Sequence, residues 1–187
     1  MKKLGMCMNS NYYVLPPLKG KTVLEIGCNE GWLATYIMEQ EPTRYLGVDL
    51  WPHKSVRESI QSSELFTRFQ YGDITDRNSL PYNQSWDVVI MFGVFYHLID
   101  PLQALINLRD LTKETLVIGT AFHLGCGTFM HFEPGYWGDP SNYWYPTKEC
   151  LLKMLSWLGL VSEVKFIWEE SKVVGCFHDR ICIHGSR

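Results

Sequence analysis

The stretch of sequence EIGCNEG, which begins at Glu25, has the residue types and the spacing of a ligand-binding turn. It follows the apolar residues 22–24 and runs into a helix-like pattern at residues 32–37, so it joins a strand to a helix. Gly27 can take a positive φ without steric cost, and the segment Gly27-Cys28-Asn29 with Gly31 is expected to hold a ligand against the main chain. The Glu25 carboxylate suits a ligand that carries an ammonium or a hydroxyl group.

This turn differs from the G-x-G-x-x-G fingerprint of dinucleotide-binding proteins. The residue two positions after Gly27 is Asn29, so the glycine that admits a pyrophosphate is missing. The sequence therefore disfavours an NAD-dependent oxidoreductase.

Two more carboxylates follow apolar segments that are typical of strands. Asp49 ends the run YLGVD, 22 residues after Gly27, and Asp73 follows YG another 24 residues on. In a doubly wound sheet, the acid at the end of the second strand lies beside the first turn, within reach of a ribose diol. The natural partner of Asp73 is an exocyclic amine. Taken singly, each Asp is more often a turn residue, but their order at successive strand ends predicts a nucleoside site.

Alternating β-rich and helical patterns indicate the elements that must position these residues. We expect seven strands, at residues 22–26, 44–49, 67–72, 86–92, 114–122, 163–168 and 180–184. Helices are expected at 31–39, around 55–63, from Asp100-Pro101 onwards, with leucines 102, 105, 108 and 111 facing the core, and at 147–158. The last two strands are too close in sequence for a crossover helix, so they should pair as an antiparallel hairpin.

Composition limits the class of protein. The chain has 187 residues, 46% of them apolar, which predicts one domain over 1–187 with an N-terminal arm at 1–20. A net charge of −3, with scattered Lys and Arg residues, argues against strong electrostatic binding of nucleic acid. No membrane span or secretion signal is expected, and six cysteines without a C-x-x-C pair indicate reduced, mostly buried thiols and a cytoplasmic protein.

These motifs, in this order, resemble the class I S-adenosylmethionine-dependent methyltransferases over residues 20–187. The resemblance implies an α/β fold with a Rossmann-like, doubly wound seven-stranded sheet, mostly parallel, that ends in an antiparallel hairpin. It also implies that S-adenosylmethionine is the cofactor, with its methionine part in the turn from Glu25 to Gly31. By the same resemblance, Asp49 holds the ribose and Asp73 the adenine amino group, and the remaining cofactor residues are Leu50 and Ile74 around adenine and Phe92 and Gly93 beside the sulfonium.

A narrower resemblance is carried by GVFYHL at 93–98, ETLVI at 114–118 and NYWYPT at 142–147. These segments are similar to the catalytic domain of the tRNA wobble-uridine carboxymethyltransferases, which use a carboxylated form of the cofactor. Tyr96 matches a member of the set that binds the extra carboxylate in that family.

Tyr96 and His97 occupy the place of a base or acceptor-orienting group in the methyltransferase resemblance. Histidine can change its charge near neutral pH, so His97 could remove a proton from the acceptor. The alternative is that Tyr96 packs on the cofactor and His97 hydrogen-bonds a carbonyl group.

The segment 123–146, rich in glycine, histidine and aromatic residues, is expected to overhang the carboxyl edge of the sheet as an acceptor-pocket lid. His123, Tyr143 and Trp144, together with Tyr96, are the expected acceptor-binding residues. His123, Cys126, His131 and Glu133 are all metal-ligand types, but their spacing matches no standard site and we expect no metal.

The sequence thus favours a methyltransferase with a small-molecule acceptor, with RNA possible but not favoured and the oligomeric state open. One alternative is a tRNA-modifying methyl- or carboxymethyltransferase. Another is a non-catalytic cofactor-binding partner subunit.

Overall fold

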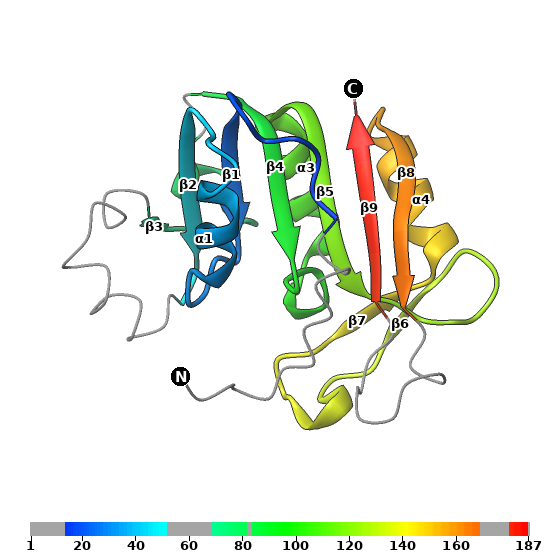
Figure 1. Cartoon of the computed structure of the whole chain (residues 1–187). Coiled ribbons are helices and arrows are strands. Elements are labelled where there is room, and N and C mark those ends of the chain that lie inside the picture. Colours follow the sequence, from blue (N-terminus) through cyan, green and yellow to red (C-terminus); the bar gives the residue numbers. More distant parts are fainter. Residues whose placement is uncertain (1–13, 52–68, 82–83, 169–179, 187) are drawn as a thin grey trace.

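The structure, a computed structural model, describes residues 14–51, 69–81, 84–168 and 180–186. Figure 1 shows one twisted sheet, and its strand order is β3-β2-β1-β4-β5-β9-β8. The strands are β1 (Thr22–Ile26), β2 (Arg44–Asp49), β3 (Phe69–Tyr71), β4 (Trp86–Phe92), β5 (Thr112–Ala121), β8 (Val161–Trp168) and β9 (Arg180–Ser186). The predicted seven-stranded sheet is therefore confirmed.

Parallel pairing joins the first five strands of the chain, and β9 pairs antiparallel with both β5 and β8. The C-terminal hairpin predicted from the short connection between the last two strands is therefore confirmed. Residues 52–68 lie outside the described chain, so the helix expected around 55–63 does as well.

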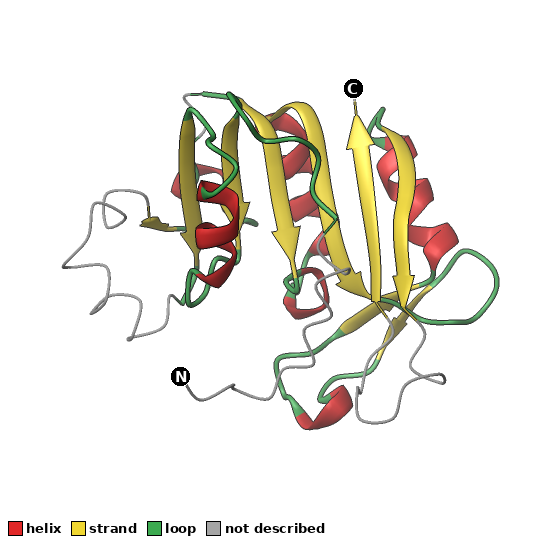
Figure 2. Cartoon of the chain, viewed as in Figure 1, coloured by secondary structure: helices red, strands yellow, loops and turns green. Residues whose placement is uncertain are grey.

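Helices cover both faces of the sheet (Figure 2). They are α1 (Trp32–Met38), α3 (Pro101–Leu111) and α4 (Lys148–Trp157). One apolar layer joins Leu24 and Ile26 of β1 to leucines of α3 and α4, and the other joins Val23 to Leu33 and Ile37 of α1. Because side chains alternate along a strand, Glu25 shares the α1 side of the sheet with Val23.

Asp100 begins α3 as the sequence predicts, since its carboxylate accepts the Gln103 N–H at 3.0 Å. Leu105, Leu108 and Leu111 are fully buried, but Leu102 is 39% exposed, so its assignment to the core was wrong. Leu111 follows Leu102 by nine positions, and at 3.6 residues per turn this separation places the two side chains about half a turn apart.

Thr147 caps α4 through the Cys150 N–H, and the chain leaves that helix at Gly159, whose φ is 78°. Among the cysteines whose side chains are described, Cys28 and Cys150 are buried free thiols, whereas Cys126 is exposed. In the described part of the chain, no helix has the length and apolarity to cross a bilayer.

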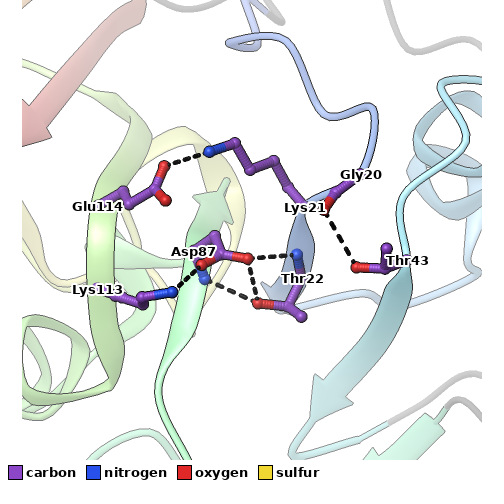
Figure 3. Close-up of polar contacts among 7 residues, drawn as sticks. All are labelled: Gly20, Lys21, Thr22, Thr43, Asp87, Lys113 and Glu114. Carbon is purple, nitrogen blue, oxygen red and sulfur yellow. Dashed lines mark hydrogen bonds and ion pairs between the residues drawn. The ribbon is translucent and has the colours of Figure 1, made fainter.

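A polar cluster fastens three strands together at the amino edge of the sheet (Figure 3). Asp87 of β4 accepts hydrogen bonds from the Thr22 N–H and hydroxyl group, both at 2.8 Å, and from Lys113 Nζ at 2.9 Å. Its pKa falls to about 2, chiefly because of the Lys113 hydrogen bond and then that of the Thr22 backbone. Lys21 and Glu114 form a neighbouring ion pair at 2.6 Å.

The sequence did not indicate a small second sheet between β5 and α4. Its strands are β6 (Met130–Phe132) and β7 (Trp144–Pro146), which pair antiparallel. An isolated bridge between His123 and Thr147 lies at its base, next to the carboxyl end of β5. The ribbon extends from that edge of the main sheet in Figure 1.

Candidate functional site

The turn after β1 has the left-handed conformations that its glycines suggest. The φ angles are 77° at Gly27, 37° at Asn29 and 70° at Gly31. However, the amides of the turn are used within the protein: the Gly27 N–H donates to Val48 O at 2.8 Å, and the Gly31 N–H to Cys28 O at 2.7 Å. The glycines therefore let a ligand come close to the main chain, rather than supplying these N–H groups as donors.

A second loop presses against this turn. A Cβ atom added to Gly27 would lie only 2.1 Å from Val94 Cγ2, so no larger residue fits without a shift of Val94. Gly93, next to Val94, has a φ of 71° and donates its N–H to Gly119 O at 2.8 Å. The loops after β1 and β4 thus meet at the carboxyl edge of the sheet.

Glu25 is buried beneath the turn, where the Tyr45 hydroxyl group donates a 2.5 Å hydrogen bond to its carboxylate. Burial raises the pKa of Glu25 to about 7, helped by the charge of Asp49 and opposed by the Tyr45 hydrogen bond. Burial of Cys28 raises the pKa of its thiol, and the charges of Glu25 and Asp49 raise it further. Cys28 therefore stays a neutral thiol and is not a thiolate nucleophile.

Asp49 ties the end of β2 to the turn. Its Oδ2 accepts the Asn29 N–H and its Oδ1 accepts the Trp51 N–H, each at 2.7 Å. A carboxylate has about four lone-pair sites, so Asp49 can accept further bonds from a ligand. Asp49 both positions the turn and presents acceptor oxygen atoms beside it.

The residues expected around adenine lie at the ends of β2 and β3. Leu50 is half exposed, whereas Ile74 is buried in the core, and the Asn107 side chain donates to its carbonyl group at 2.7 Å. Asp73 Oδ1 accepts the N–H and the hydroxyl group of Thr75 at 2.8 and 2.7 Å, which is the turn role that the sequence left open. The backbone N–H of Gly72, the residue before Asp73, donates to the backbone carbonyl of Asp49 at 3.1 Å. This bond holds the ends of β2 and β3 together.

The loop after β4 carries the candidate base. Phe92 and Tyr96 are buried, and the centroids of the Tyr96 and His97 rings lie 4.3 Å apart. A Cβ atom on Gly93 would lie 3.4 Å from the Tyr96 hydroxyl oxygen, so that hydroxyl group faces the loop. His97 Nδ1 lies 3.0 Å from Ser141 O, a carbonyl contact that the sequence interpretation left open.

The second sheet brings part of the expected acceptor-binding set to this loop. The Tyr143 N–H donates to Tyr96 O at 2.8 Å, and the neighbouring Trp144 contacts the Phe132 ring. His123 instead bonds the Gly125 N–H at 2.8 Å and lies against Phe129 at the base of the sheet.

The structure thus places Tyr143 beside Tyr96, whereas His123 contacts Gly125, Phe129 and Thr147 at the base of the second sheet. His131 pairs with Glu133 at 3.0 Å. Among the described residues, no group of three or more metal-ligand side chains has the geometry to hold an ion.

Sequence reasoning missed Val94, Asp139 and Ser141. The run Asp139-Pro140-Ser141 signals a turn. Its contact with His97, 44 residues away in the chain, has no signal in the sequence.

The residues at this edge fit S-adenosylmethionine. Gly27, Gly31 and Gly93, all at positive φ, have no Cβ atoms at this edge, and the Gly27 position has no room for one. Asp49 presents acceptor oxygen atoms that suit a hydroxyl-bearing nucleoside, whereas Glu25 lies buried beneath the turn and accepts the Tyr45 hydroxyl group.

Together, the strand order and this edge define a Rossmann-like fold of the kind found in methyltransferases. Residues 6–145 match the family model described as a methyltransferase domain, and the chain belongs to that family. The predicted class, an S-adenosylmethionine-dependent methyltransferase, is confirmed.

Solved structures agree with the fold. An S-adenosylmethionine-dependent methyltransferase from Mesorhizobium loti has a TM-score of 0.68 at 14% identity, covering 92% of this chain and 94% of that one. Magnesium protoporphyrin IX methyltransferase from Synechocystis, with bound S-adenosylhomocysteine, has a TM-score of 0.66 at 17% identity, covering 91% and 75%.

Relatives by sequence are named for a different acceptor from the one that we expected. A tRNA U34 carboxymethyltransferase of Desulfotalea psychrophila is 29% identical over 152 residues, which is 79% of this chain and 47% of that protein. The chain therefore spans about half the length of this relative. The expectation of a small-molecule acceptor, with RNA not favoured, was wrong: it rested on net charge, but RNA bases can also be recognised by stacking and shape.

Proposed function

We propose that this protein is a tRNA-modifying methyl- or carboxymethyltransferase whose acceptor is a base. The observation that carries the proposal is the close approach of Gly27 to Val94, since it brings the turn after β1 against the loop that holds Tyr96 and His97. A cofactor in the turn and an acceptor at that loop would then be neighbours. The relatives named for tRNA U34 supply the class of acceptor, and a cytoplasmic location is part of the proposal.

We assign the cofactor-binding residues as the sequence predicts, with one change of role. The turn residues Gly27, Cys28, Asn29 and Gly31 shape the methionine site by close approach, beside Glu25. Asp49 accepts from the ribose, and Leu50, Asp73 and Ile74 border the adenine. Phe92 and Gly93 would lie beside the sulfur of the bound cofactor.

Transfer from the bound cofactor needs little covalent chemistry from the protein. S-adenosylmethionine supplies a carbon that is already activated by the sulfonium. The protein must orient the acceptor and remove its proton. We assign proton removal to His97 and orientation of the acceptor to Tyr96, Tyr143 and Trp144, with His123 at the base of the proposed lid, residues 123–146.

Exposed aromatic side chains support an acceptor that is a nucleic-acid base. Trp51 is 81% exposed directly after β2, and Phe132 of β6 is 55% exposed. In Figure 1, β2 ends at the carboxyl edge of the main sheet, and the ribbon of β6 and β7 extends from that edge. Base stacking on aromatic rings depends little on net charge, so it is compatible with a chain of charge −3.

Nucleoside mass spectrometry tests the proposal. The protein is incubated with tRNA and either S-adenosylmethionine or its carboxylated derivative, and the digested tRNA is analysed. We expect a methyl or a carboxymethyl increment on one nucleoside, and the two cofactor arms tell which group is transferred.

A tRNA transcript with cytidine in place of the wobble uridine is the matched control. Loss of the product with this transcript would support uridine 34 as the acceptor. If the protein binds S-adenosylhomocysteine but modifies no tRNA nucleoside with either cofactor, the proposal is wrong.

A further inference from the structure

His97 is held by a hydrogen-bond chain from a loop 44 residues further along. Its Nδ1 lies 3.0 Å from Ser141 O and 3.0 Å from Ser141 Oγ. A carbonyl oxygen can only accept, so Nδ1 must carry the proton in this contact. In the neutral ring, the lone pair then lies on Nε2.

Asp139 completes the chain. Its Oδ1 accepts the Ser141 hydroxyl group at 2.6 Å and the Ser141 N–H at 2.9 Å. Because the hydroxyl proton points to this carboxylate, Ser141 Oγ faces His97 as an acceptor. The Ser141 hydrogen bonds lower the pKa of Asp139, as does the charge of His97 to a smaller degree, so the carboxylate is ionised at neutral pH.

Hydrogen bonds on both sides hold the loop that contains Asp139 and Ser141. The Asn142 N–H donates to Asp139 O at 3.1 Å, and the buried Asn142 side chain donates to Tyr136 O at 2.9 Å. The Tyr143 N–H donates to Tyr96 O at 2.8 Å, next to His97 itself. The loop and the His97 ring therefore have a fixed mutual geometry.

We propose that Asp139 and Ser141 are positioning residues that hold His97 as the neutral Nδ1–H tautomer, so that Nε2 is the atom that takes the acceptor's proton. This inference rests on the proposed function. As the acceptor's lone pair bonds to the transferred carbon, the electron pair of the carbon–sulfur bond stays on sulfur and the acceptor's proton moves to Nε2. The resulting imidazolium has Asp139 as its counter-charge across Ser141.

Kinetics of variants test this role, using the full chain with tRNA. His97→Gln should lower kcat about 100-fold or more. Asp139→Asn keeps an oxygen atom for Ser141 but removes the charge, and it should lower kcat about 10-fold with KM little changed. In the double variant with His97→Gln, Asp139→Asn should cause no further loss, because Asp139 acts through His97.

The pH profile separates this role from simple support of the loop. Asp139 faces the His97 ring across Ser141, and Tyr96 lies against it. Without the Asp139 charge, the neutral ring persists to lower pH, so the acidic limb of the kcat profile of Asp139→Asn should move to lower pH. Asp76→Asn is the matched control, since Asp76 also accepts a nearby amide, that of Asn78, and should leave kcat unchanged.

Nitrogen-15 NMR of histidine-labelled protein without tRNA tests the tautomer independently of turnover. We expect the His97 signals of a ring protonated at Nδ1 when it is neutral. An Nε2–H tautomer, or equal losses of kcat from Asp139→Asn with and without His97, would overturn the inference. Absence of tRNA modification by the wild type would overturn the proposed function instead, and the NMR result would still stand.

Discussion

Gly27 combines a left-handed conformation with a neighbour that only glycine tolerates. Its φ is 77°, and a Cβ atom would lie 2.1 Å from Val94 Cγ2. We expect Gly27→Ala to lose about 1–2 kcal/mol of folding free energy from the φ angle alone, with a further loss from the clash. Thermal unfolding and calorimetric titration with S-adenosylhomocysteine measure the loss of stability and of binding.

Two further variants separate the causes at Gly27. Gly20 has a φ of 73°, and a Cβ atom added there would have no other atom within 4 Å. Gly20→Ala therefore reports the conformational cost alone. Val94→Ala combined with Gly27→Ala should relieve the clash and recover part of the affinity. Wild-type stability and binding in Gly27→Ala would contradict the close approach of the two loops.

Asp49 holds the turn through the Asn29 N–H and is the proposed ribose acceptor. Asp49→Ala should weaken S-adenosylhomocysteine binding by about 1–3 kcal/mol, the usual cost of leaving polar partners unpaired. Isothermal calorimetry measures the change. Asp76→Ala, which removes a carboxylate with a similar local amide contact, should bind normally, and unchanged affinity in Asp49→Ala would refute the ribose role.

At the scale of elements, Asp87 links β4 to β1 and β5, as Figure 3 shows. Its pKa is about 2 in the folded protein, below the ordinary value of 3.8, so the folded state favours the ionised form. The stability that it contributes is present above pH about 4 and is lost as the pH falls towards about 2. Asp87→Asn should therefore flatten this part of the curve of unfolding free energy against pH.

Chemical denaturation at a series of pH values checks the role of Asp87. Glu114→Gln is the matched control in the same cluster, because the Lys21–Glu114 pair is exposed and contributes little. An equal acid-dependent loss of stability in the wild type and in Asp87→Asn would contradict the assignment.

At the scale of the whole molecule, one apolar layer runs from β1 to the C-terminal hairpin. It contains Leu24 of β1, Leu108 of α3, Leu151 of α4 and Ile183 of β9. We therefore expect residues 1–187 to unfold as one domain, with a single transition. Circular dichroism and tryptophan fluorescence should give coincident denaturation curves, whereas separate transitions would divide the chain into two units.

The sequence by itself determined the elements of the main sheet. The bounds of β1, β2 and β4 are those expected, because apolar runs that end in glycine or aspartate are local signals. The hairpin followed from the length of one connection. The positions of Gly27, Asp49 and Gly93 at one edge followed from the rule that parallel strands end together.

Only the tertiary structure decided which loops and side chains contact one another at that edge. The contact of Gly27 with Val94, the pairing of β6 with β7, and the chain from His97 through Ser141 to Asp139 all connect segments that are distant in sequence. Such contacts depend on the twist of the sheet and on the path of a long loop, which residue types and spacing do not encode. Local patterns specify strands and turns, whereas the partners of a side chain are set by where the folded backbone brings it.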